Sequence, residues 1–418
     1  MKIPFKAGNI LVPKNVDMHK WSVVACDQYT SEPKYWEEVE NIVGSSPSTL
    51  RLTLPEIFLN DENVEERITK INETMEEYLN EDIFTELDNS MVYLERTQSD
   101  GKIREGVMGI VDLEDYSYEK GSQTLIRATE KTVIERIPPR KKVRENASLE
   151  LPHIMILIDD EKKNIIESLK NKVTSKDVIY DFDLMQNGGH IKGYKLSDNI
   201  INDVIVGLTS LADKTYFENK YNVTGKGVLL FAMGDGNHSL ATAKACYESL
   251  KEKIGDKALA SPARYALVEL VNLHSPALEF EAIHRVVFDT DVNKLIDSLY
   301  KYYNINEKGN GQKFELITKD MDKVLYIENP KSNIAVGSIQ MFLDDYLKEN
   351  QGSIDYIHGE DVTKSLGSKD KNVGIIFDAM AKEDLFKTVI LDGALPRKTF
   401  SMGHSYDKRF YLEARKIK

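Results

Sequence analysis

The stretch Val228-Leu229-Leu230-Phe231-Ala232-Met233-Gly234-Asp235-Gly236-Asn237-His238-Ser239 carries the clearest structural pattern in the sequence. Val228 to Met233 is continuously apolar, which is typical of a buried strand. Residues 239–253 have the length and apolar spacing of a helix. Gly234 and Gly236 permit a sharp turn between the two, because neither has a Cβ to restrict the backbone. The segment predicts a strand–turn–helix unit and, with it, a mixed α/β (α+β) fold.

The turn offers groups that could bind a phosphate. A helix N-terminus presents backbone N–H groups and a partial positive charge. Asp235 could hold a magnesium ion, and His238 could contact phosphate or assist a proton transfer. The turn is neither a Walker A loop nor a complete Gly-x-Gly-x-x-Gly motif, since Ser239 stands at the third glycine position. The alternative is a tight turn in which Asp235 or Asn237 simply caps the helix.

A polar segment rich in Arg and Lys lies upstream, between residues 121 and 146. It contains Thr129-Glu130-Lys131-Thr132, followed by Arg140 and Arg144. A carboxylate in a cation-lined loop could stay ionised and act as a general base, so Glu130 is a candidate catalytic residue. The alternative is a solvated run of charges on a surface loop.

Two further polar stretches lie downstream. Leu395-Pro396-Arg397-Lys398-Thr399-Phe400 offers an ammonium group and a hydroxyl beside a proline turn, and both can bind phosphate. An exposed turn without a ligand is the alternative. His284-Arg285 opens the apolar run Val286-Val287-Phe288, where a structural pair at a strand end is the alternative to a substrate contact.

A chain of 418 residues is expected to form two or three domains. The pattern of elements restarts near residue 263, which places a boundary near 260. We therefore predict an N-terminal region over 1–260 and a C-terminal α/β domain over 261–418. The C-terminal domain would contribute the Pro-Arg-Lys-Thr stretch to the site.

The composition indicates which cellular compartment and which kinds of partner to expect. Two cysteines, Cys26 and Cys246, and no apparent secretory signal favour a reducing cytoplasm. No apolar stretch approaches the roughly 18 residues of a membrane helix. A net charge of −13 disfavours nucleic acid as a partner. A small-molecule substrate and a nucleotide are the expected partners, and the sequence does not decide whether the protein forms a homo-oligomer.

These stretches, in this order, resemble the bacterial domain-of-unknown-function family 1015. That family has an upstream His-Glu-x-Thr, an Asp-Gly-His-His-Arg turn and a late Pro-x-Lys-Ser/Thr. The matching stretches here are Thr129-Glu130-Lys131-Thr132, Asp235-Gly236-Asn237-His238-Ser239 and Pro396-Arg397-Lys398-Thr399. His284-Arg285 matches a His-Arg pair expected between the last two, and the likeness spans most of the chain.

A more distant likeness, to free serine kinases of the ParB/sulfiredoxin fold, implies a mechanism. It implies a ParB/sulfiredoxin-like core at about 120–260, with elaborations. Glu130 would be the base for the serine hydroxyl, Asp235 a metal or hydroxyl partner, and His238 a phosphate ligand. The likeness also makes Lys398 and Thr399 nucleotide contacts. Beyond the likeness, we expect further nucleotide or phosphate contacts from Gly234, Gly236, Asn237, Ser239, Thr132, Arg140 and Arg144, and a substrate side lined by Asp27, Glu32, His284 and Arg285.

The sequence departs from that pattern at three positions. Asn237 replaces the first His of the turn, Ser239 replaces the Arg, and Thr129 replaces the His before Glu130. The loss of the Arg removes a bidentate phosphate clamp that Ser does not mimic. Arg127, Arg140 or Arg144 could compensate from the upstream loop.

The predicted function is a nucleotide- and Mg²⁺-dependent phosphotransferase that acts on a small hydroxylated metabolite. The first candidate reaction is free L-serine to O-phosphoserine, with ATP or ADP as the nucleotide. The alternative is a nucleotide-binding regulatory protein of ParB-like fold without phosphotransfer. A third reading is an inactive scaffold whose turn only caps a helix.

Overall fold

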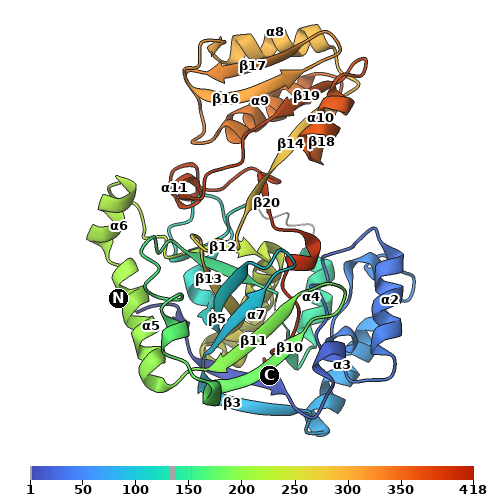
Figure 1. Ribbon diagram of the computed structural model, residues 1–418, viewed down its shortest axis with the longest axis vertical. Coiled ribbons are helices and arrows are strands. Elements are labelled where there is room, and N and C mark those ends of the chain that lie inside the picture. The colour runs from blue at the N-terminus through green and yellow to red at the C-terminus, as the bar shows by residue number, and fades with distance from the viewer. Residues whose placement is uncertain (1, 131–136, 152) are drawn as a thin grey trace. The chain divides into compact units, whose positions relative to one another are not determined.

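The computed structural model describes residues 2–130, 137–151 and 153–418, which divide into two compact units (Figure 1). Unit 1 consists of the described residues of Met1–Ala128, Thr132–Leu278 and His404–Lys418. Unit 2 consists of Thr129, Glu130 and Glu279–Gly403. Both units combine helices with sheets, so the predicted mixed α/β class is confirmed.

A large mixed sheet organises unit 1. Its strand order is β10-β11-β4-β5-β13-β9-β12-β7-β6, with β1 pairing along β5. β13 runs parallel to β9 and antiparallel to β5. The bounds are β1 (Phe5–Lys6), β4 (Val92–Thr97), β5 (Ile103–Asp112), β6 (Tyr116–Ser117), β7 (Ile126–Arg127), β9 (Met155–Ile158), β10 (Val178–Asp183), β11 (His190–Lys195), β12 (Phe231–Asp235) and β13 (Tyr265–Asn272).

Both faces of this sheet are buried. Successive side chains of a strand point to opposite faces, so Tyr93 of β4 packs in one core cluster while Val92 and Leu94 pack in another. α5 and α7 supply side chains to the first cluster and α2 to the second. The helices of unit 1 are α1 (Met18–Trp21), α2 (Pro33–Val43), α3 (Val64–Asn80), α4 (Ile137–Glu145), α5 (Asp198–Leu211), α6 (Lys214–Tyr221) and α7 (Asn237–Ile254).

The predicted strand–turn–helix unit is present as β12, Gly236 and α7. Phe231, Ala232 and Met233 are fully buried, because β12 lies between β7 and β9 in the sheet. The strand begins three residues later than the apolar run and extends through Asp235, which pairs with Met155 of β9 after a shift in register. Pairing with β9 therefore carries the strand into the glycine turn.

The end of the chain returns to unit 1. Leu11 and Ala414 exchange backbone hydrogen bonds of 2.8 and 2.9 Å. β21 (Arg415–Lys416) pairs with β8 (Leu149–Glu150), while β2 (Gly8–Pro13) pairs with β3 (Phe84–Ser90). In the sequence, β13 comes after the boundary predicted near residue 260. It pairs with β5 and β9, which are both strands of unit 1.

Unit 2 has its own antiparallel sheet, in the order β15-β17-β16-β19-β14-β18, with β20 pairing along β14. Its strands are β14 (Phe280–Phe288), β15 (Ile305–Asn306), β16 (Gln312–Ile317), β17 (Asp322–Ile327), β18 (Ser353–His358), β19 (Val373–Ile376) and β20 (Phe400–Met402). Its helices are α8 (Val292–Tyr302), α9 (Ala335–Glu349), α10 (Glu360–Gly367) and α11 (Glu383–Asp392). Val286 and Val287 of β14 are fully buried, as befits a strand paired on both sides.

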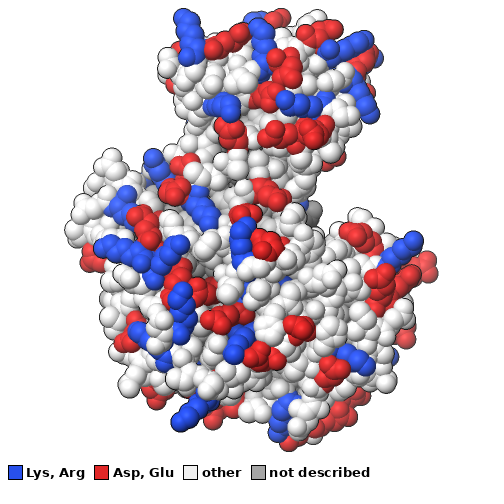
Figure 2. All heavy atoms as spheres, in the orientation of Figure 1, with Lys and Arg blue, Asp and Glu red and all other residues white. Residues whose placement is uncertain are grey.

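Charged side chains of both signs lie on the surface (Figure 2). On the face shown in Figure 2, acidic and basic side chains are interspersed rather than gathered into one patch of either sign. Among the described residues, none of the helices combines the length and apolar composition required to cross a membrane.

Candidate functional site

The turn between β12 and α7 is shaped by Gly236. This residue is the N-cap of α7 and has φ +77°, in the left-handed region that favours glycine. A Cβ there would also lie 3.0 Å from the Cα of Ile154. The N–H of Gly236 donates to Oδ1 of Asp235 at 2.8 Å. Since a glycine has no side chain, Gly236 makes no side-chain hydrogen bond to cap the N-terminus of α7.

Lys408 is a cation at this turn that the sequence did not suggest. Its Nζ lies 3.2 Å from Oδ2 of Asp235, and the two side chains are 15% and 25% exposed. Both carboxylate oxygens of Asp235 are therefore engaged, one by an N–H group and one by an ammonium group. Magnesium prefers oxygen ligands and usually takes one or two carboxylates together with phosphate oxygens. As arranged, Asp235 fits a resident magnesium ion poorly.

His153 is a second group that the sequence did not suggest. Its buried ring lies with Nδ1 2.8 Å from the Tyr411 hydroxyl and Nε2 3.2 Å from Oγ of Ser239. Oδ2 of Asp27 lies 3.5 Å from the same Nε2. His153 thus connects Asp27, predicted to lie on the substrate side, with Ser239, predicted to contact phosphate.

Electrostatics favours the charged form of this pair. Burial lowers the pKa of His153, but attraction to the Asp27 carboxylate outweighs it and the net pKa is raised. Burial likewise raises the pKa of Asp27, but His153 reverses this and the net pKa is lowered. Because Asp27 and Ser239 both approach Nε2, the three residues do not form the relay of a serine hydrolase, which needs the carboxylate on Nδ1.

A cavity of about 150 Å³ in unit 1 adjoins His153 and Ser239. The predicted phosphate ligands Arg140 and Arg144 line it. The guanidinium of Arg140 is paired with Glu56, and that of Arg144 lies 2.5 Å from the carboxylate of Glu150. The structure thus brings Arg140, Arg144 and Ser239 to one cavity, with both arginine charges neutralised by carboxylates.

Other predicted residues of unit 1 lie elsewhere or serve the fold. Glu32 is exposed and precedes α2, outside the lining of the cavity. Gly234 permits close packing, since a Cβ there would lie 2.9 Å from Cγ of Leu157. Arg127 is buried and donates to the carbonyl groups of Thr124 and Gly227, at 2.8 and 2.6 Å, so it holds the chain rather than replacing the missing clamp. Thr132 lies outside the described residues.

The half-buried His238 occupies the first turn of α7, with Asn237 beside it. The carbonyl of His238 accepts a hydrogen bond of 2.7 Å from Oγ1 of Thr242. This bond joins consecutive turns of the helix, so it fixes the backbone of His238 at the glycine turn.

Unit 2 brings the other predicted stretches together. The N–H of Leu395 donates to the carbonyl of Thr129 at 2.7 Å, and Glu130 and Leu395 form an isolated parallel bridge. Arg285 of β14 is fully buried, and its guanidinium donates to the carbonyls of Lys398 and Arg397 at 2.9 and 3.2 Å. Arg285 therefore holds the Pro-Arg-Lys-Thr loop, which gives it a positioning role rather than direct exposure to a substrate.

Arg285 interacts electrostatically with Glu130. Burial lowers the pKa of Arg285 to about 10, while Tyr356 and the Glu130 carboxylate act in the opposite direction. His284 is a structural neighbour: its Nδ1 accepts from the N–H of Phe377 at 3.3 Å, and burial lowers its pKa. Glu130 thus lies in the field of a buried cation, which favours its ionised form.

The loop presents two exposed cations, Arg397 and Lys398. Nε of Arg397 donates to the Tyr356 hydroxyl at 2.9 Å, and Lys398 has φ +57°. Thr399 is buried, and its hydroxyl donates to the carbonyl of Pro396 at 2.7 Å. The loop's own backbone therefore uses the Thr399 hydroxyl, while the Lys398 side chain is exposed to solvent.

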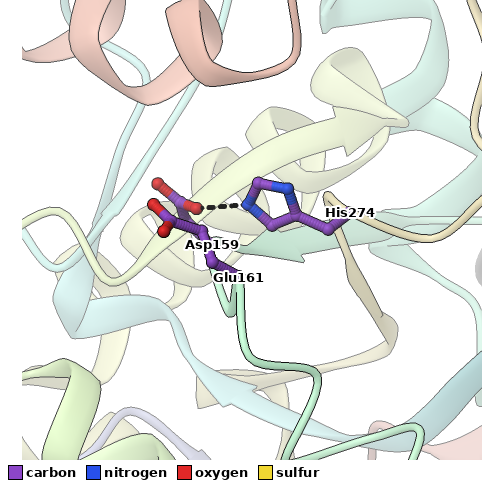
Figure 3. Close-up of side chains that lie close together, drawn as sticks. All are labelled: Asp159, Glu161 and His274. Atoms are coloured by element: carbon purple, nitrogen blue, oxygen red, sulfur yellow. Dashed lines mark hydrogen bonds and ion pairs between the residues drawn. The ribbon is translucent and has the colours of Figure 1, made fainter.

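Asp159, Glu161 and His274 form a compact cluster elsewhere in unit 1 (Figure 3). Nε2 of His274 lies 2.6 Å from Asp159, and the Lys220 ammonium lies 2.9 Å from Asp159 and 3.2 Å from Glu161. Tyr221 also donates to Asp159 at 2.5 Å. Lys220 pairs with both carboxylates, and the Asp159 carboxylate also contacts Tyr221 and His274, so these contacts join separate segments of unit 1.

Comparison with known proteins places the chain in a family. Residues 3–346 match the family model described as protein of unknown function (DUF1015), and the chain belongs to this family. No curated protein matches it.

Solved structures give only distant likenesses. A free serine kinase mutant in complex with ADP is 11% identical, with 74% of this chain and 92% of that chain covered and a TM-score of 0.38. A conserved hypothetical protein from Pyrococcus furiosus is 12% identical, with 74% and 94% covered and a TM-score of 0.35. SbnI with a C-terminal truncation, from Staphylococcus aureus, is 9% identical, with 73% and 82% covered and a TM-score of 0.36.

Proposed function

We propose that this DUF1015 protein binds a nucleotide through its phosphates at the β12–α7 turn and transfers a phosphoryl group to a small hydroxylated metabolite. The observation that carries the proposal is the glycine N-cap of α7, with Lys408 beside Asp235 and His153 beside Ser239. The N-terminus of a helix favours an anion, and a nearby lysine and a histidine with a raised pKa would add to that attraction.

His153 offers a replacement for the arginine that this turn lacks. Ser239 stands where the resemblance expects that arginine, and His153 approaches its hydroxyl at 3.2 Å. A buried imidazolium at the first turn of α7 would supply the missing positive charge, although without bidentate geometry. The turn would then hold phosphate through backbone N–H groups, Ser239 and His153, with His238 as a further ligand.

For the transfer step, we assign Glu130 as the base that accepts the proton of the substrate hydroxyl. Arg285 supports this role, since a buried cation favours the ionised carboxylate. Lys398 would contact the nucleotide as a point charge. Phosphoryl transfer depends mainly on positioning and charge neutralisation, which these groups supply. Magnesium would enter the site bound to the nucleotide phosphates and would not be held by Asp235 beforehand.

The proposal is tested with purified protein, Mg²⁺, ATP or ADP, and free L-serine as the first substrate. Phosphoserine measured by mass spectrometry is the expected product, and Glu130→Gln should reduce its rate at least about 100-fold, as loss of a general base does. Glu328→Gln, an exposed carboxylate of unit 2, is the matched control and should keep the activity. Equal rates in the two variants would remove Glu130 from the mechanism.

One observation favours a second candidate, a nucleotide-binding regulator without phosphotransfer. Asp235 is already paired with Lys408, so the carboxylate predicted to hold magnesium for chemistry is occupied. A regulator would show thermal stabilisation by ATP, ADP or CTP that Lys408→Ala weakens, without any turnover of nucleotide. Stabilisation accompanied by phosphoserine formation would favour the kinase instead.

A further inference from the structure

The cavity beside His153 has an apolar wall that the proposed phosphate contacts do not use. Its lining includes Leu54, Leu59, Met75, Val143 and Leu149, which come from segments far apart along unit 1. Leu54, Met75 and Leu149 are at most 6% exposed. A cavity of about 150 Å³ is large enough for a six-membered ring or a short alkyl chain.

The polar groups of the cavity gather around His153 and Ser239. His153 directs Nε2 at Oγ of Ser239, so a charged imidazole can donate its proton to that oxygen. The hydroxyl proton of Ser239 then has no acceptor in the hydrogen bonds recorded for the described residues. This proton is available to an oxygen atom of a ligand in the cavity.

The charges of the cavity disfavour an ionic ligand. Arg140 is paired with Glu56 and Arg144 with Glu150, and the carboxylate of Glu150 also lies 2.6 Å from Nε of Arg415. The thiol of Cys26 is neutral as well, since burial raises its pKa to about 12. His153 is likewise paired with Asp27, so a carboxylate or ammonium group placed here would lose its hydration and would have to compete with an existing ion pair for its partner.

We propose that this cavity binds a neutral alcohol with an apolar body, and that its hydroxyl hydrogen-bonds with Ser239. If the proposed phosphotransferase function holds, such an alcohol is the acceptor, in preference to zwitterionic L-serine. Its oxygen bonds to the terminal phosphorus of the nucleotide, the bridging P–O bond breaks with its electrons going to the nucleotide, and the hydroxyl proton passes to the base. Binding of the alcohol itself requires no nucleotide.

The test uses the full chain, without nucleotide, labelled with ¹³C at the methionine methyl groups. Met75 lines the cavity, so its methyl resonance, assigned with Met75→Leu, reports on binding. Titration with n-alcohols from propanol to hexanol should tighten binding about three- to fourfold per added methylene, the factor expected from burial of one CH₂. Hexanol should also bind more tightly than hexanoate or hexylammonium.

Two variants that fill the cavity from separate segments of the chain, at Val143 of α4 and at Leu59, keep the proposal falsifiable. Val143→Phe and Leu59→Phe should each weaken hexanol binding at least about tenfold, as expected when a ligand of this size loses its space. Val206→Phe is the matched control, because Val206 is 59% exposed on α5 in the same unit. Affinity that ignores chain length, tighter binding of hexanoate, or unchanged binding in both filled variants would overturn the proposal.

The two proposals fail separately. Hexanol binding without any phosphorylated product retains the cavity assignment and removes the phosphotransferase. Formation of phosphoserine without hexanol binding retains the phosphotransferase and removes the apolar alcohol as its acceptor.

Discussion

Glu269 of β13 is a fully buried carboxylate in the large sheet of unit 1. Its Oε1 lies 3.2 Å from Nε of Arg104, and its Oε2 is paired with Arg409. Burial raises the pKa of Glu269, but the two guanidinium groups more than compensate, so the net pKa is lowered. Gly106 leaves the space for this carboxylate, since a Cβ there would lie 2.7 Å from Oε1.

Replacing Glu269 with Gln should destabilise the protein by about 3–5 kcal/mol, because it leaves buried guanidinium groups without their counter-charge. Urea unfolding at pH 7, followed by tryptophan fluorescence, measures the loss. Glu86→Gln is the control, since Glu86 pairs with Lys416 at the surface and should cost about 1 kcal/mol or less. Similar losses in both variants would contradict the importance of this buried pair.

His153 allows a pH prediction. Its folded pKa is raised, so its contribution to stability is present below the unfolded pKa of about 6.5 and is lost as the pH rises through the folded value. Asp27→Asn should lower the pKa of His153, since burial is then opposed only by the smaller effects of Asp235 and Glu56. NMR titration of the imidazole Cε1–H measures both values.

The surface residue His190 provides the internal control for that titration. Burial lowers its pKa, but the hydrogen bonds that its ring donates to the carboxylates of Asp183 and Asp181 outweigh burial, so the net pKa is also raised; neither carboxylate changes in Asp27→Asn. His190 should therefore titrate identically in both proteins. If His153 does so as well, the pairing with Asp27 is not what sets its charge.

At the scale of elements, the Pro-Arg-Lys-Thr loop depends on the strand beneath it. Arg285→Lys should loosen the loop, because lysine cannot span the carbonyls of both Arg397 and Lys398. Each carbonyl left without a donor costs about 1–3 kcal/mol when buried. Hydrogen exchange at the amide of Leu395 should accelerate by at least about tenfold, a change of 1.4 kcal/mol in local opening.

Arg397→Lys is the matched control for this change. Arg397 is exposed, and its Nε donates to the Tyr356 hydroxyl at 2.9 Å, outside the set of bonds that hold the loop backbone. Exchange at Leu395 should stay within about twofold of the wild type, since surface substitutions have small effects. Equal acceleration in both variants would mean that Arg285 does not hold the loop.

The sequence predicted local strand–turn–helix structure better than it predicted contacts between residues far apart along the chain. The β12–α7 junction was identifiable because an apolar run, two glycines and a helical pattern are adjacent in the chain. Lys408 was not, since it reaches Asp235 from more than 170 residues away along the chain. His153 was likewise hidden, because its partners Asp27, Ser239 and Tyr411 come from separate segments. The assigned roles in phosphate binding and catalysis stay predictions.

At the scale of the whole molecule, unit 1 is assembled from segments at both ends of the chain. Residues 279–403 belong to unit 2, and in the sequence they separate two segments of unit 1. The family match ends at residue 346, whereas residues 404–418 return to unit 1. There Phe410, Tyr411 and Leu412 are at most 2% exposed, and Arg409 pairs with Glu269. The last residues therefore belong to the core rather than to a tail.

Removing residues 404–418 should abolish cooperative folding of unit 1. Each of the buried side chains Phe410, Tyr411 and Leu412 is worth about 2–5 kcal/mol, so together they rival the roughly 5–15 kcal/mol that stabilises a typical domain. Unit 2 should keep its structure, because its sheet is formed within residues 279–403. Hydrogen exchange measured by mass spectrometry should show lost protection in β5 and β13, with protection retained in β14 and β19.

A chain shortened by Lys418 alone is the control and should retain protection in all four strands. Lys418 is exposed, and its ammonium contacts the carbonyl of Asn146 at the surface. Protected β5 and β13 amides in the longer truncation would mean that the sheet closes without its final segment.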